Sequence, residues 1–297
     1  MQRWTYILTL ALLTACGGGD AARDSGRGER GGEHRPAAAY GRRFLLLSGD
    51  REAPFTAVFD FSALDGPNEI RRGAGAWYAR GAEWTRLFQH AWTTEPIREP
   101  WRLVPYGPIR LIVGDGEEIE TLVHRAEPGA FRLSPSGPLA EWSMNDGAQL
   151  RLRHAELLLG DARITGILLD LQTAVPDRYD GALGLAFLTD GVGLHLVIAR
   201  DSSIHAPAWL WQGAENVSWD AVEISTLAAD TAGPGWRITE PRDELTGELR
   251  VVGSELVLTY PDEALAPTAR VSLVDGWLEV RGGERQRVFG VVRHGEE

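Results

Sequence analysis

The sequence predicts an all-β protein in which antiparallel strands form a barrel or a sandwich. From Phe44 onward, short apolar or alternating segments follow one another, and Gly and Asp residues separate them. Turn signals at such regular spacing are typical of all-β folds. No long segment repeats its apolar residues at the 3.6-residue period of an amphipathic helix. Because 297 residues exceed the length of one small barrel, we expect two β-domains in tandem, with one enlarged sheet structure as the alternative.

Residues 1–15 have the layout of a signal peptide. A charged start at Arg3 is followed by the apolar run WTYILTLALL at residues 4–13 and then by two small residues. The run is about half as long as the roughly 20 residues that a helix needs to cross a bilayer. We therefore expect this segment to be removed by cleavage.

The next four residues, Leu13-Thr14-Ala15-Cys16, resemble the lipobox of bacterial lipoproteins. The resemblance implies that the Cys16 thiol is lipidated and that the chain is cleaved just before this residue. It also implies a lipid anchor at the bacterial cell envelope, in the outer membrane or on the exported face of the inner membrane. The alternative is a plain secretory signal with a cysteine near its cleavage site by accident. Cys16 is the single cysteine of the chain, so no disulfide is expected.

Residues 16–39 are expected to be the lipidated cysteine and a flexible linker. After Cys16, the segment GGGDAARDSGRGERGGEHRPAAA contains no large apolar residue. Such a composition buries too little apolar surface to offset the entropy that ordering costs.

Four segments of the body predict hairpins, at residues 44–61, 110–124, 186–199 and 269–282. In the last three, Asp-Gly stands between β-prone runs, which is a strong signal for a tight turn. Short helices are conceivable only at residues 82–92 and 221–229. The Pro- and Asp-rich segment at residues 173–181 is the best boundary, which predicts β-domains at residues 40–174 and 175–297.

Two tandem β-barrel halves, with GWLEV at residues 276–280 and the closing strand RVFGVVRH at residues 287–294, resemble the lipocalin-like secreted proteins related to carotenoid hydratases. The resemblance covers the layout of residues 44–297. It implies an apolar ligand and water addition to a double bond. No motif matches specifically enough to transfer a catalytic residue, so catalytic residues are not assigned.

Charge excludes some classes of partner. The formal net charge is −12, and all 30 basic residues are Arg. An acidic protein is a poor ligand for nucleic acid and for anionic lipid headgroups. We expect contact with the membrane through the N-terminal lipid and no nucleic-acid partner, and the sequence does not identify a protein partner.

The chain is unusually rich in tryptophan, with 11 residues of this type. Trp209 and Trp211 are two residues apart, so on an extended chain they face the same side. Aromatic side chains in such positions can line a pocket for an apolar or ring-shaped ligand. The alternative is that they fill the interior of a large β structure. The candidate ligand-binding residues are Trp92, Trp101, His195, His205, Trp209, Trp211 and Trp219.

The sequence gives little support for a metal site, a dinucleotide site or a serine hydrolase. His154-Ala155-Glu156 has the H-x-E spacing of a zinc deaminase but lacks the C-x-x-C ligands. His90, His195 and His205 are not in metal-ligand spacing, so no metal is predicted. The segment GAGAWY at residues 73–78 lacks the third glycine of a dinucleotide site, and G-x-S-x-G is absent. We predict no cofactor.

The sequence therefore predicts an envelope lipoprotein that binds an apolar or carbohydrate-like small molecule in a tryptophan-lined β pocket. A lipocalin-like hydratase or hydrolase is one alternative. A structural or assembly lipoprotein without a small ligand is another.

Overall fold

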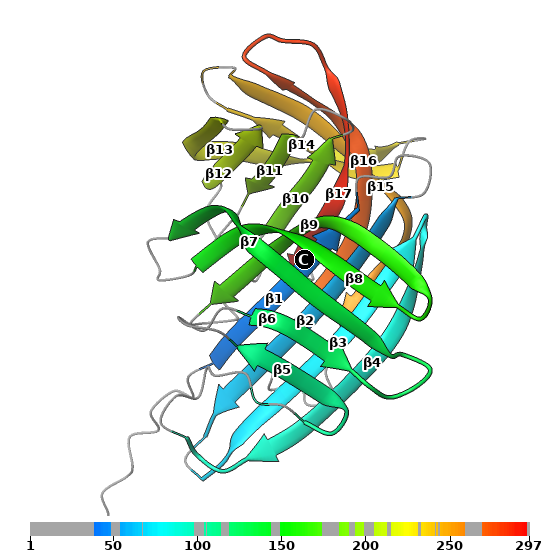
Figure 1. The fold of residues 1–297 in the computed structure, drawn as a ribbon. Coiled ribbons are helices and arrows are strands. Elements are labelled where there is room, and N and C mark those ends of the chain that lie inside the picture. The colour runs from blue at the N-terminus through cyan, green and yellow to red at the C-terminus, as the bar shows by residue number, and fades with distance from the viewer. Residues whose placement is uncertain are drawn as a thin grey trace, which may run out of the picture. The chain divides into compact units, whose positions relative to one another are not determined.

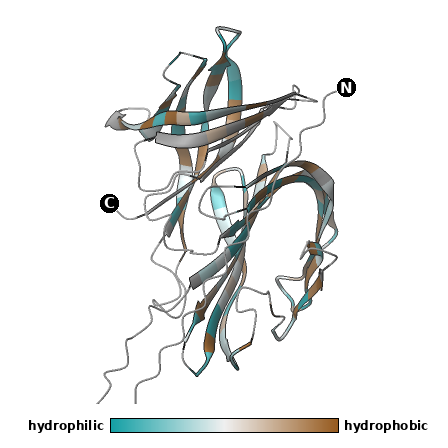
Figure 2. Cartoon of the chain, turned by 90° about the vertical axis from the view of Figure 1, so that its left-hand side faces the viewer, coloured by the Kyte–Doolittle hydropathy of each residue, from teal (hydrophilic) through white to brown (hydrophobic). Residues whose placement is uncertain are grey.

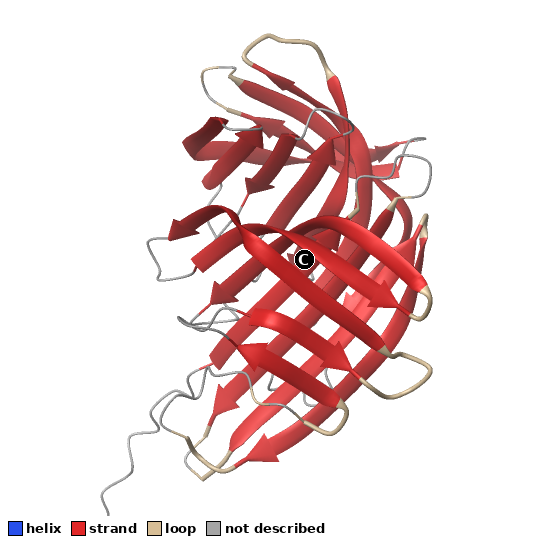
Figure 3. Cartoon of the chain, in the orientation of Figure 1, coloured by secondary structure: helices blue, strands red, loops and turns tan. Residues whose placement is uncertain are grey.

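The computed structural model describes residues 39–295 except the segments 49–53, 67, 98–103, 105, 114–118, 144–148, 174–183, 190–193, 199–204, 213–214, 231–232, 241, 243 and 259–268. The predicted signal peptide, Cys16, nearly all of the linker and Trp101 lie outside the described residues. Every regular element described is a strand (Figure 3). No helix long and apolar enough to cross a bilayer occurs in the part of the chain that the structure describes.

The first nine strands form one antiparallel sheet in the order β4-β3-β2-β1-β9-β8-β7-β6-β5. Figure 1 shows this sheet curling, so that β5 to β8 cross in front of β1 to β4. The strands are β1 (Ala39–Leu47), β2 (Phe55–Asp65), β3 (Ile70–Arg80), β4 (Glu83–Thr94), β5 (Ile109–Val113), β6 (Ile119–His124), β7 (Phe131–Ser143), β8 (Gln149–Leu159) and β9 (Ala162–Thr173).

The last eight strands form a closed barrel in which each strand pairs with the next and β10 pairs with β17. This is the up-and-down connectivity of lipocalin-type barrels. The strands are β10 (Gly184–Thr189), β11 (Leu194–Ile198), β12 (His205–Gln212), β13 (Glu215–Asp230), β14 (Gly233–Thr239), β15 (Leu245–Leu258), β16 (Ala269–Val280) and β17 (Gln286–Gly295).

The predicted fold class is confirmed, and so are the hairpins at residues 44–61, 110–124 and 186–199. The hairpin predicted within residues 269–282 is wrong, because β16 runs unbroken through Asp275 and Gly276. A Cβ atom at Gly276 would lie 2.0 Å from the Glu248 carbonyl oxygen of β15. The missing side chain of Gly276 allows the backbones of β15 and β16 to approach closely, and this glycine does not form a turn.

The two short helices are also wrong. Residues 82–92 fall largely in β4, and residues 221–229 fall in β13. β4 pairs along its whole length with β3, and β13 pairs with both β12 and β14. These ladders satisfy the backbone groups that a helix would have satisfied internally.

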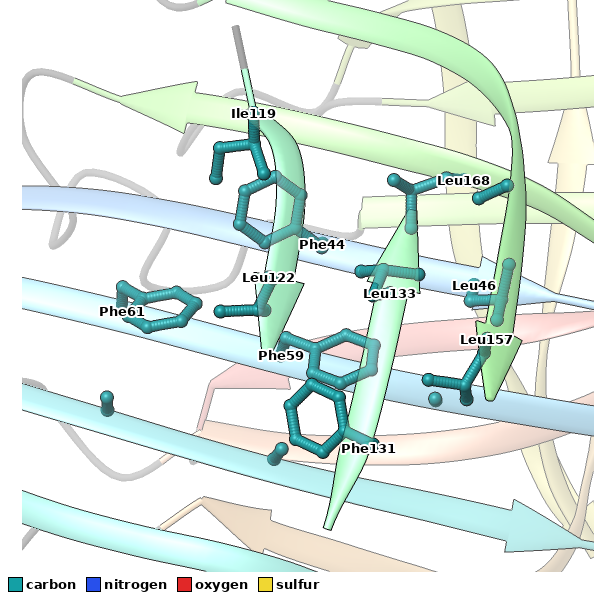
Figure 4. Packing of buried hydrophobic residues seen from close by; sticks show 14 of the residues in the cluster. Phe44, Leu46, Phe59, Phe61, Ile119, Leu122, Phe131, Leu133, Leu157 and Leu168 are labelled. Atoms are coloured by element: carbon teal, nitrogen blue, oxygen red, sulfur yellow. The ribbon is translucent and has the colours of Figure 1, made fainter. Parts of the chain in front are cut away.

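The apolar core of the curled sheet contains residues from all nine of its strands. Figure 2 shows hydrophilic and hydrophobic residues mixed along the strands. Because successive side chains of a strand point to opposite faces, one face of every strand can contribute to a single cluster. Figure 4 shows Phe59 of β2 beside Phe131 of β7, and their ring centroids lie 5.0 Å apart. The curl therefore brings distant strands of the sheet into contact.

A buried ion pair ties β1 to β9 on the same face. Nε and Nη2 of Arg42 donate to Oδ1 and Oδ2 of Asp170 at 3.0 and 2.8 Å, and both side chains are almost fully buried. The Arg42 guanidinium also lies 5.2 Å from the ring centroid of Phe44. Two parallel hydrogen bonds fix the geometry of a buried pair, which offsets part of the cost of removing both charges from water.

The opposite face of the curled sheet packs against the barrel. One apolar cluster contains Leu45, Val58 and Trp77 from the sheet together with Val271 and Leu273 from the barrel. The barrel has a second cluster of its own, which includes Leu210, Trp219 and Leu278. Residues 37–297 form one compact unit.

A bulge in β15 contacts the turn between β3 and β4. The pairing of β15 with β16 shifts register between Val252 and Leu256, and Gly253 has a positive φ of 76°. The Ser254 amide and hydroxyl both donate to the Ala82 carbonyl oxygen at 3.1 Å. A Cβ atom at Gly253 would lie 2.5 Å from the Ala82 Cβ atom. Glycine is required here both by the backbone conformation and by the close contact.

Candidate functional site

Aromatic and imidazole rings gather where β4, one edge of the curled sheet, meets β6 and β7. β4 supplies three of them, at alternating positions. Single residues of β6, of β7 and of the segment before β5 supply the rest. We call this group the aromatic seam; it consists of Phe88, His90, Trp92, Tyr106, His124 and Phe131.

The local sequence explains why β4 can present three large rings side by side. Residues two apart on a strand point to the same face. On the neighbouring strand β3, Ala76 stands opposite Phe88, and Ala74 stands opposite His90. Both alanines are completely buried. Small side chains on β3 therefore leave the space above them to the rings of β4.

The seam is a continuous series of ring contacts. The centroid of Phe88 lies 4.6 Å from that of His124 and 5.5 Å from that of His90, with the rings nearly parallel in both pairs. The centroids of His90 and His124 are 6.1 Å apart. Trp92 stacks on Tyr106 at 4.8 Å, and Tyr106 meets His90 edge-on at 6.0 Å. These separations are the ones that aromatic pairs prefer.

The exposure of the rings changes along the seam. Tyr106 is 42% exposed, whereas His124 is 4% exposed. Trp92 and His90 are half-buried. The seam therefore leads from the solvent to the apolar core of the curled sheet.

One glycine holds the two sides of the seam together. Gly129 lies in the turn between β6 and β7, and a Cβ atom there would be 2.2 Å from the Leu87 carbonyl oxygen of β4. The Gly129 carbonyl oxygen accepts a hydrogen bond of 2.9 Å from Nδ1 of His124. Gly129 thus contacts β4 on one side and orients the His124 ring on the other.

Three nitrogen atoms of the seam are buried without a hydrogen-bond partner in the described structure. They are Nε2 of His90, Nε2 of His124 and Nε1 of Trp92. A buried polar atom left unpaired costs about 1–3 kcal/mol. Three such atoms in one ring cluster form an arrangement that a polar group of a bound molecule could satisfy.

Burial lowers the pKa of His90 below its ordinary value of 6.5, and the nearby His124 lowers it further. Near pH 7 the His90 imidazole is therefore neutral, with one nitrogen as donor and the other as acceptor. Neutral imidazoles bind uncharged polar groups and can accept a proton. Among the described residues, no group of three or more His, Cys, Asp or Glu side chains is placed to hold a metal ion.

The ligand-binding residues that the sequence predicts do not all meet in one place. Trp92 belongs to the aromatic seam. Trp219 lies in the barrel core, where its Nε1 donates to Oε2 of Glu244 at 3.3 Å. Trp101 lies outside the described residues. The backbones of His195 and Trp211 pair directly across β11 and β12, and those strands also contain His205 and Trp209. The ligand-binding role of these residues stays a prediction.

The sequence does not predict most of the seam. His90 falls in a segment expected to be helical, and no sequence pattern points to His124. The alternation of Phe88, His90 and Trp92 was a usable signal for one ringed face of a strand. The positions of Tyr106 and His124 relative to that face depend on the curl of the sheet, which spacing along the chain does not reveal.

No protein-family model matches the chain, and no curated protein sequence matches it. Solved structures do match. Kievitone hydratase from Nectria haematococca matches with a TM-score of 0.54 and 11% identity, over 88% of this chain and 89% of that chain. A protein from Nitrosomonas europaea provisionally named AttH matches with a TM-score of 0.52 and 13% identity, over 86% and 92%. CghA matches with a TM-score of 0.50 and 12% identity, over 88% of each chain.

The likeness is one of fold. At these identities the matches show that the chain has the lipocalin-like architecture of these proteins over most of its length. The resemblance to the carotenoid-hydratase type is thereby supported at the level of the fold.

Replacing Gly129 with Ala should destabilise the protein by about 1–3 kcal/mol, because the added methyl group collides with the β4 backbone at Leu87. The measurement is the free energy of unfolding in urea. Gly137→Ala is the matched control, since a Cβ atom at this exposed glycine meets nothing within 4 Å. Equal stability of the two variants would show that the turn does not press on β4.

Proposed function

We propose that this protein binds a small, mainly apolar molecule at the aromatic seam while a lipid on Cys16 holds it at the bacterial cell envelope. The observation that carries the proposal is the seam itself, in which stacked rings surround three buried nitrogen atoms without partners. Ligand sites are mostly apolar surfaces with a few polar groups that fix orientation. The seam has this composition.

The energetics favour a ligand that is apolar over most of its surface. Removing apolar surface from water contributes about 25 cal/mol per Å². Phe88 and Phe131 are buried at the inner end, whereas Tyr106 is exposed at the outer end. A molecule that replaces water at the outer rings gains this contribution, and a polar group on it would satisfy the unpaired nitrogens if it lies within hydrogen-bond distance of them.

Attachment to the envelope is proposed from the sequence alone. The lipobox-like Leu13-Thr14-Ala15-Cys16 and the polar segment after it support a lipid anchor with a flexible linker. A net charge of −12 speaks against electrostatic attachment to anionic lipid. The lipid would therefore be the contact with the membrane, in the outer membrane or on the exported face of the inner membrane.

A lipocalin-like enzyme of the hydratase type is the second candidate. The observation that favours it is the pair His90 and His124, since imidazoles are the commonest general acids and bases in enzymes. The fold match to kievitone hydratase is compatible with this candidate. An enzyme would transform the molecule bound at the seam, whereas a binding protein would return it unchanged.

The test of binding is native mass spectrometry of the full-length protein purified from its membrane, followed by extraction into organic solvent. We expect one small molecule per chain. Trp92→Leu should lose it, because this change removes the stacking surface beside Tyr106 and the indole N–H. Trp277→Leu is the control, since this half-buried tryptophan lies in β16 of the barrel. An empty wild-type protein, or equal loss in both variants, would contradict the proposal.

The test of the anchor is Cys16→Ala. Without the thiol, no lipid can be attached, so the protein should no longer fractionate as a lipidated membrane protein and should lack the mass of the acyl chains. Fractionation of membranes and intact-mass measurement provide the readout. A variant that stays membrane-bound with the mass expected from the single substitution alone would show that the wild-type protein is not held by this lipid.

A further inference from the structure

We infer that the ligand of the aromatic seam is an uncharged molecule with a hydroxylated aromatic ring, whose hydroxyl group hydrogen-bonds Nε2 of His124 and Nε2 of His90. This inference rests on the proposed function and names the chemical class of its ligand. Its support is the set of buried nitrogen atoms in the seam that have no hydrogen-bond partner among the described residues.

The hydrogen-bonding role of His124 follows from its partner. A carbonyl oxygen only accepts hydrogen bonds, so Nδ1 of His124 must carry the hydrogen in its 2.9 Å contact with the Gly129 carbonyl. In the neutral ring, Nε2 is then an acceptor. This atom is buried and has no partner in the described structure. A ligand with an O–H or N–H group could therefore donate a hydrogen bond to Nε2 of His124.

His90 adds a second unpaired nitrogen, on a ring that neighbours His124. Its Nε2 is also buried without a partner among the described residues, and its ring centroid lies 6.1 Å from that of His124. None of the described residues is hydrogen-bonded to this Nε2, so the ring can adopt the tautomer in which Nε2 donates. A hydroxyl group donates one hydrogen bond and accepts others, which lets a single oxygen serve both imidazoles. An amine donor would satisfy His124 but would offer a poorer acceptor to His90.

The walls of the seam favour a ring. Phe88 stacks against both imidazoles, and Trp92 and Tyr106 lie flat against each other toward the solvent. A planar ring gains offset-stacked or edge-on contacts with such walls beyond its buried area. The Trp92 indole N–H remains for an acceptor elsewhere on the molecule, such as an ether, carbonyl or second hydroxyl oxygen.

A charged ligand fits less well. None of the six seam residues is a carboxylate or a guanidinium, and His90 is neutral near pH 7 because burial lowers its pKa. The basic residue opposite Trp92 on β3 is Arg72, whose Nε already donates to Oγ1 of Thr94 at 3.1 Å. A charge buried without compensation is expensive, so a neutral hydroxyl is favoured over a carboxylate or an ammonium group.

The experiment compares four probes by isothermal titration of the full-length protein after its native ligand has been extracted. p-Cresol carries both proposed features. Toluene lacks the hydroxyl group, cyclohexanol lacks the aromatic ring, and benzoate carries a charge. We expect p-cresol to bind about tenfold more tightly than each of the others, because p-cresol alone combines a hydroxyl group for the two imidazoles with a planar ring and no charge.

His124→Asn tests the proposed partner. The asparagine amide can still donate to the Gly129 carbonyl, but the Nε2 acceptor is gone. We expect this variant to bind p-cresol no better than toluene. His154→Asn is the matched control, since His154 is exposed on β8, and it should keep the full preference for p-cresol.

The outcomes separate this inference from the proposed function. If wild-type protein binds toluene and p-cresol equally, the hydroxyl inference is wrong while binding of apolar molecules stands. If benzoate binds most tightly, the ligand is anionic and the inference is wrong. If no probe binds, and the native protein yields no extractable molecule, both the inference and the proposed function fail. The comparison of probes on wild-type protein holds even if His124→Asn does not fold.

Discussion

The candidate site depends on one contact, between the turn that joins β6 to β7 and the backbone of β4. Gly129 lies so close to the Leu87 carbonyl oxygen that no side chain fits between them. Leu87 is also the position where the pairing of β4 with β3 shifts register, between Ala76 and Trp77. A bulge inserts one extra residue into a strand, bends it and increases its twist. The bulge and the glycine contact therefore act at the same point of the strand.

This contact determines which rings can meet. The ladder of the nine-stranded sheet has β4 at one edge and β5 at the other. Ladder hydrogen bonds that join neighbouring strands do not hold these edges together in the described structure. Packing of rings from β4 against those of β6 and β7 takes their place, with His124 oriented by the same glycine whose turn contacts β4. The curvature of the sheet and the geometry of the seam are thus consequences of the same few contacts.

Three buried polar atoms without a partner among the described residues lie together in the seam, while others, such as Oγ of Ser62 and Nε1 of Trp84, lie elsewhere in the curled sheet. The core also contains matched polar groups, as with the two hydrogen bonds between Arg42 and Asp170. The seam differs in that two of its unpaired nitrogens are on imidazoles whose ring centroids are only 6.1 Å apart. Functional sites are where natural proteins tolerate such local costs.

The sequence correctly predicts the fold class and three hairpins whose strands are neighbours in the chain. At β4 it wrongly predicts a helix, because Trp84, Leu87, Phe88 and Ala91 repeat at helical spacing. The bulge at Leu87 explains the ambiguity, because it places Trp84 against the cluster that faces the barrel and Phe88 in the core of the curled sheet. Asp275-Gly276 was misleading because a close approach between strands and a turn both require glycine. The seam could not be predicted, since its residues come from strands that meet only through the curl.

Ligand binding at the seam is tested most directly by a high-resolution crystal structure of the protein purified with its native contents. We expect a non-protein molecule against Trp92 and Tyr106, with a polar atom about 2.6–3.2 Å from Nε2 of His124. If this nitrogen is bonded to another protein group, or only to water, the seam is not a ligand site of this kind.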